Sequence, residues 1–93
     1  MFMYSEEELK ESITSHMKSI GLLNNKRCVD KGNIVLSVAR KLNIIESQEY
    51  LIENAFDILV QEDYIRSNFS NYNADGKRIG ITYTSQEEKF YLK

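Results

Sequence analysis

The sequence predicts an α+β fold in which a core of three helices is followed by a β-hairpin. Three successive segments repeat apolar residues at spacings of three and four, which is typical of one buried helix face. After Asp63 the pattern changes to an alternation of apolar and polar residues, which is typical of strands. Residues 73–76 (Asn-Ala-Asp-Gly) are a strong signal for a tight turn between two strands. A chain of 93 residues is expected to form one domain, residues 1–93.

The first helix is expected at about residues 6–20. Ser5 and Glu8 form an S-x-x-E capping box, and the acidic residues that follow Ser5 suit the positive end of the helix dipole. Gly21 is expected to end the helix because glycine tolerates the left-handed conformation found there. Residues 27–29 leave room for a very short strand before the next helix.

The second and third helices are predicted from their caps and apolar faces. Residues 30–33 have the composition of a turn, so Asn33 is the expected cap of the second helix. Ser47 is the expected cap of the third helix, which should end near Glu62. The buried faces are expected to contain Ile34, Val35, Val38, Ala39 and Leu42 in the second helix, and Leu51, Ile52, Ala55, Phe56, Leu59 and Val60 in the third.

The hairpin is expected to pair a strand at residues 64–66 with a return strand at residues 79–83. The sequence allows two predictions for the secondary structure at the end of the chain. Ser85 and Glu88 repeat the capping box, which predicts a short helix over residues 86–93. The alternative is a third strand at residues 89–92.

This order of elements is that of the winged helix, a helix-turn-helix with a hairpin attached. Three stretches resemble bacterial winged-helix regulators of the MarR or PadR kind. They are residues 38–44 at the end of the second helix, residues 56–66 leading into the wing, and residues 81–92 leaving it. The resemblance implies a small transcriptional regulator. It also implies a homodimer formed through the first helix and the tail of residues 86–93.

A second resemblance is to the C-terminal winged-helix domain of cullins, which tolerates a longer turn between the second and third helices. The similar stretch is residues 58–65. On this resemblance Met17-Lys18 falls near the lysine that cullins use for ubiquitin-like modification. The acidic third helix and the long wing of residues 67–78 depart from the cullin pattern.

Charge separates the candidate partners. The third helix of a DNA-binding winged helix enters the major groove, where it meets a dense line of phosphates. Residues 45–63 contain no Lys or Arg, and the formal net charge of the chain is −2. A protein partner is therefore expected rather than nucleic acid, although an ordinary solvated helix face would carry the same charges. The expected protein-interaction residues are Glu49 and Glu53 in the third helix and Phe69 and Tyr72 in the wing.

The alternative function is a dimeric DNA-binding regulator that contacts phosphates through Arg40, Lys41, Lys77 and Arg78. The two functions require different arrangements of these residues. DNA binding needs the four basic side chains to converge beside the third helix. Protein binding needs an exposed apolar or aromatic patch with the carboxylates at its rim.

The sequence lacks the motifs that metal binding and nucleotide chemistry require, and its many carboxylates are expected on exposed helix faces, where burial does not tune an acid–base pair. One histidine, His16, and one cysteine, Cys28, are too few for a structural zinc site. The glycines do not form a phosphate-binding loop. We therefore expect a non-enzymatic protein with no cofactor and no metal. The chain lacks a long apolar run and a basic leader segment, and its single thiol suits a reducing compartment, so a cytoplasmic protein without membrane contact is expected.

Overall fold

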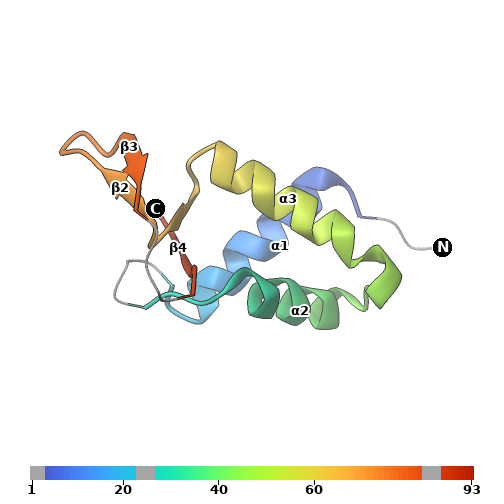
Figure 1. Ribbon diagram of the computed structural model, residues 1–93. Coiled ribbons are helices and arrows are strands. Elements are labelled where there is room, and N and C mark those ends of the chain that lie inside the picture. The colour runs from blue at the N-terminus through green and yellow to red at the C-terminus, as the bar shows by residue number, and fades with distance from the viewer. Residues whose placement is uncertain (1–3, 23–26, 83–86) are drawn as a thin grey trace.

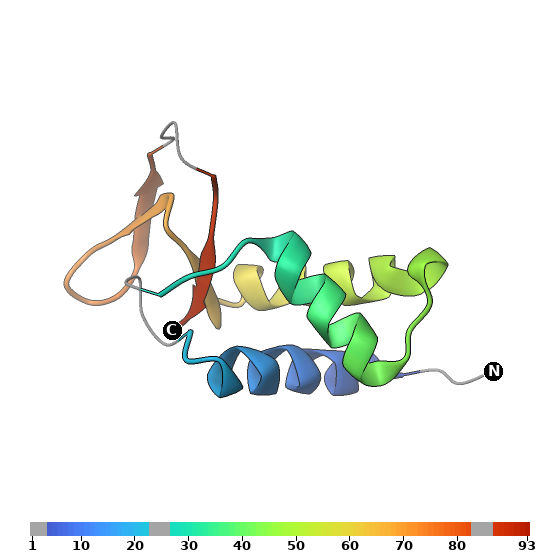
Figure 2. The same ribbon diagram turned by 90° about the horizontal axis from the view of Figure 1, so that it is seen from below.

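The computed structural model describes residues 4–22, 27–82 and 87–93. Its helices lie side by side in one part of the molecule and its strands gather at the other end (Figures 1 and 2). The predicted α+β class is confirmed. In the described part of the chain the elements are α1 (Glu6–Ser19), α2 (Lys31–Leu42), the short 3₁₀ helix η1 (Glu46–Gln48), α3 (Glu49–Gln61), β1 (Ile65–Ser67), β2 (Ser70–Tyr72), β3 (Arg78–Ile81) and β4 (Phe90–Leu92). No helix in these residues is both long and apolar enough to cross a membrane.

Strand β4 is paired on both of its edges. On one edge it runs antiparallel to β1, with Ile65 opposite Leu92 and Ser67 opposite Phe90. On the other edge Val29 forms an isolated bridge with Phe90, in which each residue donates its N–H to the other's carbonyl at 3.1 and 2.8 Å. The short strand expected at residues 27–29 is therefore present as a bridge at Val29.

Strands β2 and β3 form a separate antiparallel hairpin beyond β1. The turn predicted at residues 73–76 connects them, and Gly76 takes the positive φ of 79° that such a turn requires. The register shifts between Asn71 and Tyr72, whose partners are Gly80 and Arg78, so Ile79 is an extra residue that forms a β-bulge. The predicted pairing of residues 64–66 with residues 79–83 is wrong, because β1 pairs with β4 and the return strand pairs with β2.

The core lies where the three helices meet the strands. Phe56 of α3 is fully buried at its centre, and its ring contacts the edge of Phe90 at a centroid distance of 4.9 Å. All three helices and two strands contribute apolar side chains to this single cluster. The buried apolar residues are Leu9, Ile13, Met17, Leu22, Ile34, Val35, Val38, Ala39, Ile52, Ala55, Phe56, Leu59, Ile65, Phe90 and Leu92.

Each of the three α-helices ends in the same way, with one residue in the left-handed conformation. These residues are Gly21, Asn43 and Asp63, with φ of 77°, 54° and 63°. In each case the N–H of the next residue returns to a carbonyl five positions earlier, at 2.9 Å, which satisfies the end of the helix. The prediction that α1 ends at Gly21 is confirmed, as is the capping box of Ser5 and Glu8.

The cap of α2 is Asp30, so the prediction of Asn33 is wrong. The carboxylate of Asp30 accepts the backbone N–H of Asn33 at 3.1 Å and its side-chain amide at 2.6 Å. The helix therefore starts at Lys31 and includes Gly32 in its first turn. Aspartate is the better acceptor because its charge also interacts with the helix dipole.

Replacing Asp30 with alanine is expected to lower the free energy of unfolding by about 1 kcal/mol, since one N-cap bond is lost. The hydrogen bond from the Asn33 backbone holds the pKa of Asp30 below its ordinary value of 3.8. The stabilisation is thus present above pH 3.8 and is lost as the pH falls through the folded-state pKa. Urea unfolding at pH 7 and pH 3 should show the difference between wild type and Asp30→Ala shrinking at the lower pH. Asp75→Ala, in the exposed turn, is the matched control.

One further cap prediction also fails. Ser47 lies inside η1, and no side chain caps the start of α3. The predicted helix over residues 86–93 is contradicted by β4, whose backbone groups are bonded to Val29 and Leu22, and the alternative strand at residues 89–92 is confirmed. Ser85, the supposed cap of that helix, lies outside the described residues. A dimer surface made by a helical tail is therefore not present in the described residues 87–93.

Candidate protein-interaction site

Helix α3 turns one face to the core and the opposite face outward. Ile52, Ala55, Phe56 and Leu59 are buried. The exposed positions follow the same helical period on the other side, and they carry no cation. They are Tyr50, Glu53, Asn54, Asp57 and Gln61.

Three of the six carboxylates on or beside α3 are neutralised within the molecule. Asp57 pairs with Lys31 at 2.7 Å, and Glu62 pairs with Lys10 at 2.9 Å. Asp63 pairs with Lys93 at 3.2 Å and with Arg66 at 3.4 Å. Burial alone would raise the pKa of Asp63, but the hydrogen bonds from Lys93 and Arg66 outweigh it, so its pKa lies below the ordinary value. These three carboxylates therefore join α3 to its neighbours.

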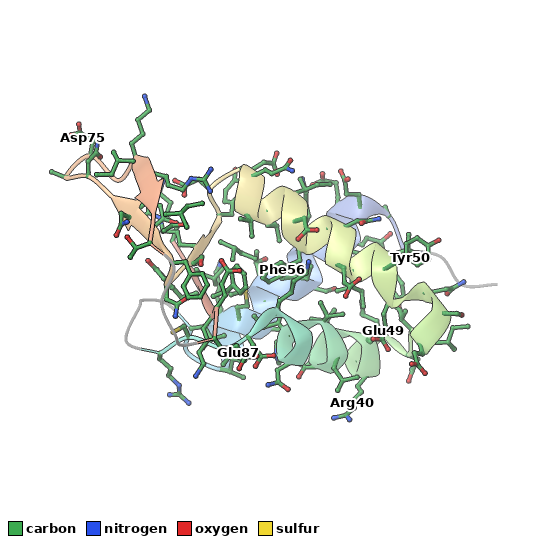
Figure 3. All side chains as sticks on the ribbon, viewed as in Figure 1. Arg40, Glu49, Tyr50, Phe56, Asp75 and Glu87 are labelled. Carbon is green, nitrogen blue, oxygen red and sulfur yellow. The ribbon has the colours of Figure 1, made fainter. Side chains whose placement is uncertain are left out.

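The other three carboxylates lie at the start of α3 and have no such partner. Glu46, Glu49 and Glu53 form no ion pair with any described residue. Ile45 and Tyr50 belong to the same segment, and 62% and 55% of their surfaces are exposed. We call Ile45, Glu46, Glu49, Tyr50 and Glu53 the α3 entry surface. Figure 3 shows Glu49 and Tyr50 at this end of the helix.

The sequence analysis selected Glu49 and Glu53 from this surface but missed Ile45 and Tyr50. The apolar residues of α3 that recur at helical spacing begin at Leu51 and Ile52, and neither missed residue is part of that series. An apolar residue out of phase with the buried face is the signal that could have identified them.

The wing residues predicted for the same site lie elsewhere. The β2–β3 hairpin is at the opposite end of the molecule from the start of α3 (Figure 1), so Phe69 and Tyr72 do not join Glu49 and Glu53. Both aromatic side chains are half-buried. The Tyr72 ring lies against the guanidinium group of Arg66, with 4.0 Å between that group's carbon and the ring centroid. Tyr72 therefore has a structural contact inside the wing.

Arg66 connects the hairpin to the rest of the fold. Its Nη2 donates to the carbonyl of Gly76 at 2.7 Å and to the carboxylate of Asp63 at 3.4 Å. Its side chain is 14% exposed, and its Nε is buried without a hydrogen-bond partner among the described residues. One side chain thus bonds to the turn of the wing, the end of α3 and the ring of Tyr72.

The four basic residues of the DNA-binding alternative do not converge. Arg40 and Lys41 lie in the last turn of α2, whereas Lys77 and Arg78 lie in the hairpin. Figure 3 shows Arg40 and Asp75, which is close to Lys77 in the sequence, at opposite ends of the molecule. The convergence beside α3 that DNA binding would need is not present.

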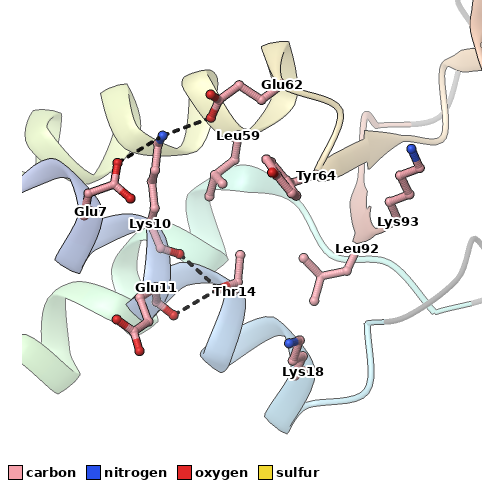
Figure 4. A pocket seen from close by; sticks show the side chains of 10 residues that line it. All are labelled: Glu7, Lys10, Glu11, Thr14, Lys18, Leu59, Glu62, Tyr64, Leu92 and Lys93. Atoms are coloured by element: carbon pink, nitrogen blue, oxygen red, sulfur yellow. Dashed lines mark hydrogen bonds and ion pairs between the residues drawn. The ribbon is translucent and has the colours of Figure 1, made fainter.

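Two grooves run along α1, one on each side. The larger, about 710 Å³, lies between α1, the end of α3 and β4 (Figure 4). The smaller, about 520 Å³, lies between α1 and the end of α2 and includes His16 and Lys41. Among the described residues no group of three or more His, Cys, Asp or Glu side chains is placed to hold a metal ion.

His16 is expected to make stability pH-dependent. It is 7% exposed, its Nδ1 has no partner among the described residues, and burial followed by the charge of Lys41 lowers its pKa below 6.5. Its neutral form stabilises the fold fully above pH 6.5, and this contribution is lost as the pH falls through the folded-state pKa. Urea unfolding between pH 7.5 and 5.5 should show a larger loss for wild type than for His16→Gln. Equal losses would contradict the prediction.

The sequence matches no protein-family model, and no similarity to a curated protein or to a solved structure was found. The resemblances to MarR or PadR regulators and to cullins therefore stay predictions. The site is defined by its geometry alone.

Proposed function

We propose that the chain is a non-enzymatic winged-helix module that regulates by binding another protein. The strand pairing supports the winged-helix part of this proposal. A winged helix places three helices against strands that pair across the sequence, and here β4 pairs with both β1 and Val29. The β2–β3 hairpin is then the tip of the wing.

The observation that carries the protein-binding proposal is the α3 entry surface. Exposed aromatic and apolar residues with a polar rim are typical of a protein interface, and a few residues, often Tyr, Trp or Arg, contribute most of the binding energy. Tyr50 and Ile45 supply the anchors, and the three carboxylates that form no ion pair with the described residues supply the rim. The matching partner surface has a pocket for Tyr50 and Lys or Arg side chains around it.

The test compares three forms of the protein as bait for partner capture. Ile45→Ser/Tyr50→Ser removes both anchors, and Ile79→Ser removes an isoleucine of similar exposure on the hairpin. The expected result is a partner retained by wild type and Ile79→Ser and lost with the double variant. A partner retained equally by all three forms would exclude the α3 entry surface.

The second candidate function is DNA binding through Lys77 and Arg78 of the wing alone, without the convergence of four basic residues beside α3. Lys77 and Arg78 are exposed on the hairpin and form no ion pair with the described residues. Fluorescence anisotropy with mixed duplex DNA at low and moderate salt tests it. Binding that weakens steeply with salt and is lost in Lys77→Gln/Arg78→Gln would favour DNA. No binding at low salt is the result expected from the acidic α3.

A further inference from the structure

The β2–β3 hairpin carries exposed apolar side chains next to positive charges. Ile79 and Ile81 lie two residues apart on β3, and 67% and 48% of their surfaces are exposed. Lys77 and Arg78 come directly before them and form no ion pair with any described residue. We call Lys77, Arg78, Ile79 and Ile81 the hairpin surface.

The hairpin surface and the α3 entry surface have opposite charges. The α3 entry surface carries three carboxylates, and residues 45–63 contain no Lys or Arg. Residues 70–82 of the hairpin contain Lys77, Arg78 and a single acidic residue, Asp75 in the turn. Complementary charges steer two surfaces together and fix how they orient. The two surfaces of this chain therefore match each other in charge.

Both surfaces also have apolar area left to bury. Each carries two large side chains with about half to two-thirds of their surface exposed, namely Ile45 and Tyr50 on one and Ile79 and Ile81 on the other. Removing such area from water is the main driving force of association. Four side chains cover less than a standard interface, so we expect a weak contact that forms at high protein concentration.

The two surfaces cannot meet within one chain. The start of α3 lies at one end of the molecule and the hairpin lies at the other (Figure 1). A contact between them therefore joins two chains, and it leaves each chain one unused surface for a further neighbour. Contacts between two different surfaces are called heterologous, and they repeat from chain to chain.

We propose that the hairpin surface of one chain binds the α3 entry surface of a second copy, so that the chains associate head to tail. Ile79 and Ile81 pack against the partner's Tyr50. Lys77 and Arg78 face the three carboxylates around that ring. This inference rests on the α3 entry surface of the proposed function, and it adds that a copy of the chain competes with the other protein for that surface.

Two variants that each lack one surface test the head-to-tail contact. Ile45→Ser/Tyr50→Ser removes the apolar centre of the α3 entry surface, and Ile79→Ser/Ile81→Ser removes that of the hairpin surface. In sedimentation equilibrium of the purified protein, the average mass of wild type should rise with concentration beyond that of a dimer. Each variant alone should remain a monomer. An equimolar mixture of the two should form dimers and no larger species, because each mixed pair holds one intact surface of each kind.

The matched control is Tyr64→Ser, because Tyr64 is 59% exposed and belongs to neither surface, so this variant should associate like wild type. A wild type that is monomeric at the highest accessible concentration would overturn the proposal. A mixture that stays monomeric would also overturn it, as would association of either variant alone at wild-type strength. Circular dichroism of each variant verifies that the exposed substitutions leave the fold intact.

A charge exchange tests the pairing of the two surfaces. Glu46→Lys/Glu53→Lys and Lys77→Glu/Arg78→Glu each set like charges against one another, and each should weaken self-association by about 10-fold or more. All four substitutions in one chain restore opposite charges and should return the dissociation constant to within about 3-fold of wild type. Lys18→Glu, an exposed cation outside both surfaces, should leave it unchanged. A fourfold variant as weak as the two double variants would contradict the pairing.

Self-association is measured on the purified chain, so its failure is distinct from a failure of the proposed function. A monomeric wild type that still captures a partner through Tyr50 would overturn the head-to-tail contact alone. Self-association without any captured partner would contradict the proposed function alone. Where both hold, Ile79→Ser/Ile81→Ser should capture more partner than wild type, because no second copy then covers its α3 entry surface.

Discussion

Phe56→Ala is expected to lower the free energy of unfolding by about 3–5 kcal/mol, the largest effect of any single change considered. Phe56 is fully buried, its ring packs edge-on against Phe90, and the amino group of Lys31 lies 5.6 Å from its centroid. Alanine would leave a cavity where α3, α2 and β4 meet. A domain of this size has a total stability of only about 5–14 kcal/mol, so the variant should be partly unfolded near 37 °C.

Urea or thermal unfolding of Phe56→Ala measures this effect. Tyr50→Ala is the aromatic control, because more than half of its surface is exposed and its loss should cost less than about 0.5 kcal/mol. A loss below 1 kcal/mol for Phe56→Ala would contradict the central position of this ring in the core.

Arg66→Ala is expected to weaken the attachment of the β2–β3 hairpin to the rest of the fold, while the helices stay folded. The substitution removes the donor to the Gly76 carbonyl, one partner of Asp63 and the cation against Tyr72. Hydrogen bonds from a charged group and a cation–π contact together give an expected loss of about 2–3 kcal/mol. Most of this loss should appear locally in the hairpin.

Amide hydrogen exchange resolves the effect of Arg66→Ala residue by residue. Protection should fall at the Asn71–Gly80 pair of the hairpin, while amides in α1 and α3 change little. Arg78→Ala is the control, since Arg78 is exposed and outside any ion pair of the described residues. Arg66→Lys should behave more like the alanine variant than like wild type, because lysine lacks the planar guanidinium group that stacks on the Tyr72 ring. Uniform loss of protection over the whole chain would disagree with a local role.

The parts of the fold that sequence predicted well depend on short-range interactions. The capping box of Ser5 with Glu8 and the end of α1 at Gly21 involve residues within a few positions of each other. The N-cap of α2 and the secondary structure at the end of the chain were harder to predict, because the sequence of each is compatible with two local structures. Asp30 and Asn33 are both good caps, and the same buried face fits either start.

The C-terminal strand shows why local patterns can mislead. Residues 85–88 have the composition of a capping box, but the backbone of β4 meets Val29, Leu22 and β1, which are far away in the sequence. Those partners satisfy its N–H and C=O groups, and Phe90 and Leu92 are buried at the same time. A helix over the same residues would lose both gains.

The candidate site was predictable in composition and not in geometry. The acidic character of the third helix followed from the sequence, but the separation of Glu53 from Tyr72, and of Arg40 from Arg78, depends on the packing of the whole chain. Exposure of Ile45 and Tyr50 depends equally on which neighbours the fold provides. Pairing of Asp57, Glu62 and Asp63 within the molecule likewise needed the tertiary structure.

The bulge at Ile79 has a consequence for aggregation. In the described residues β3 pairs only with β2, and the exposed side chains of Ile79 and Ile81 would make its free edge attractive to another strand. The extra residue interrupts the regular two-residue spacing of outward N–H and C=O groups, so an incoming strand cannot form a continuous ladder. Lys77 and Arg78 add repulsion between identical edges. The wing can therefore expose two isoleucines at its tip and still resist fibril-like stacking.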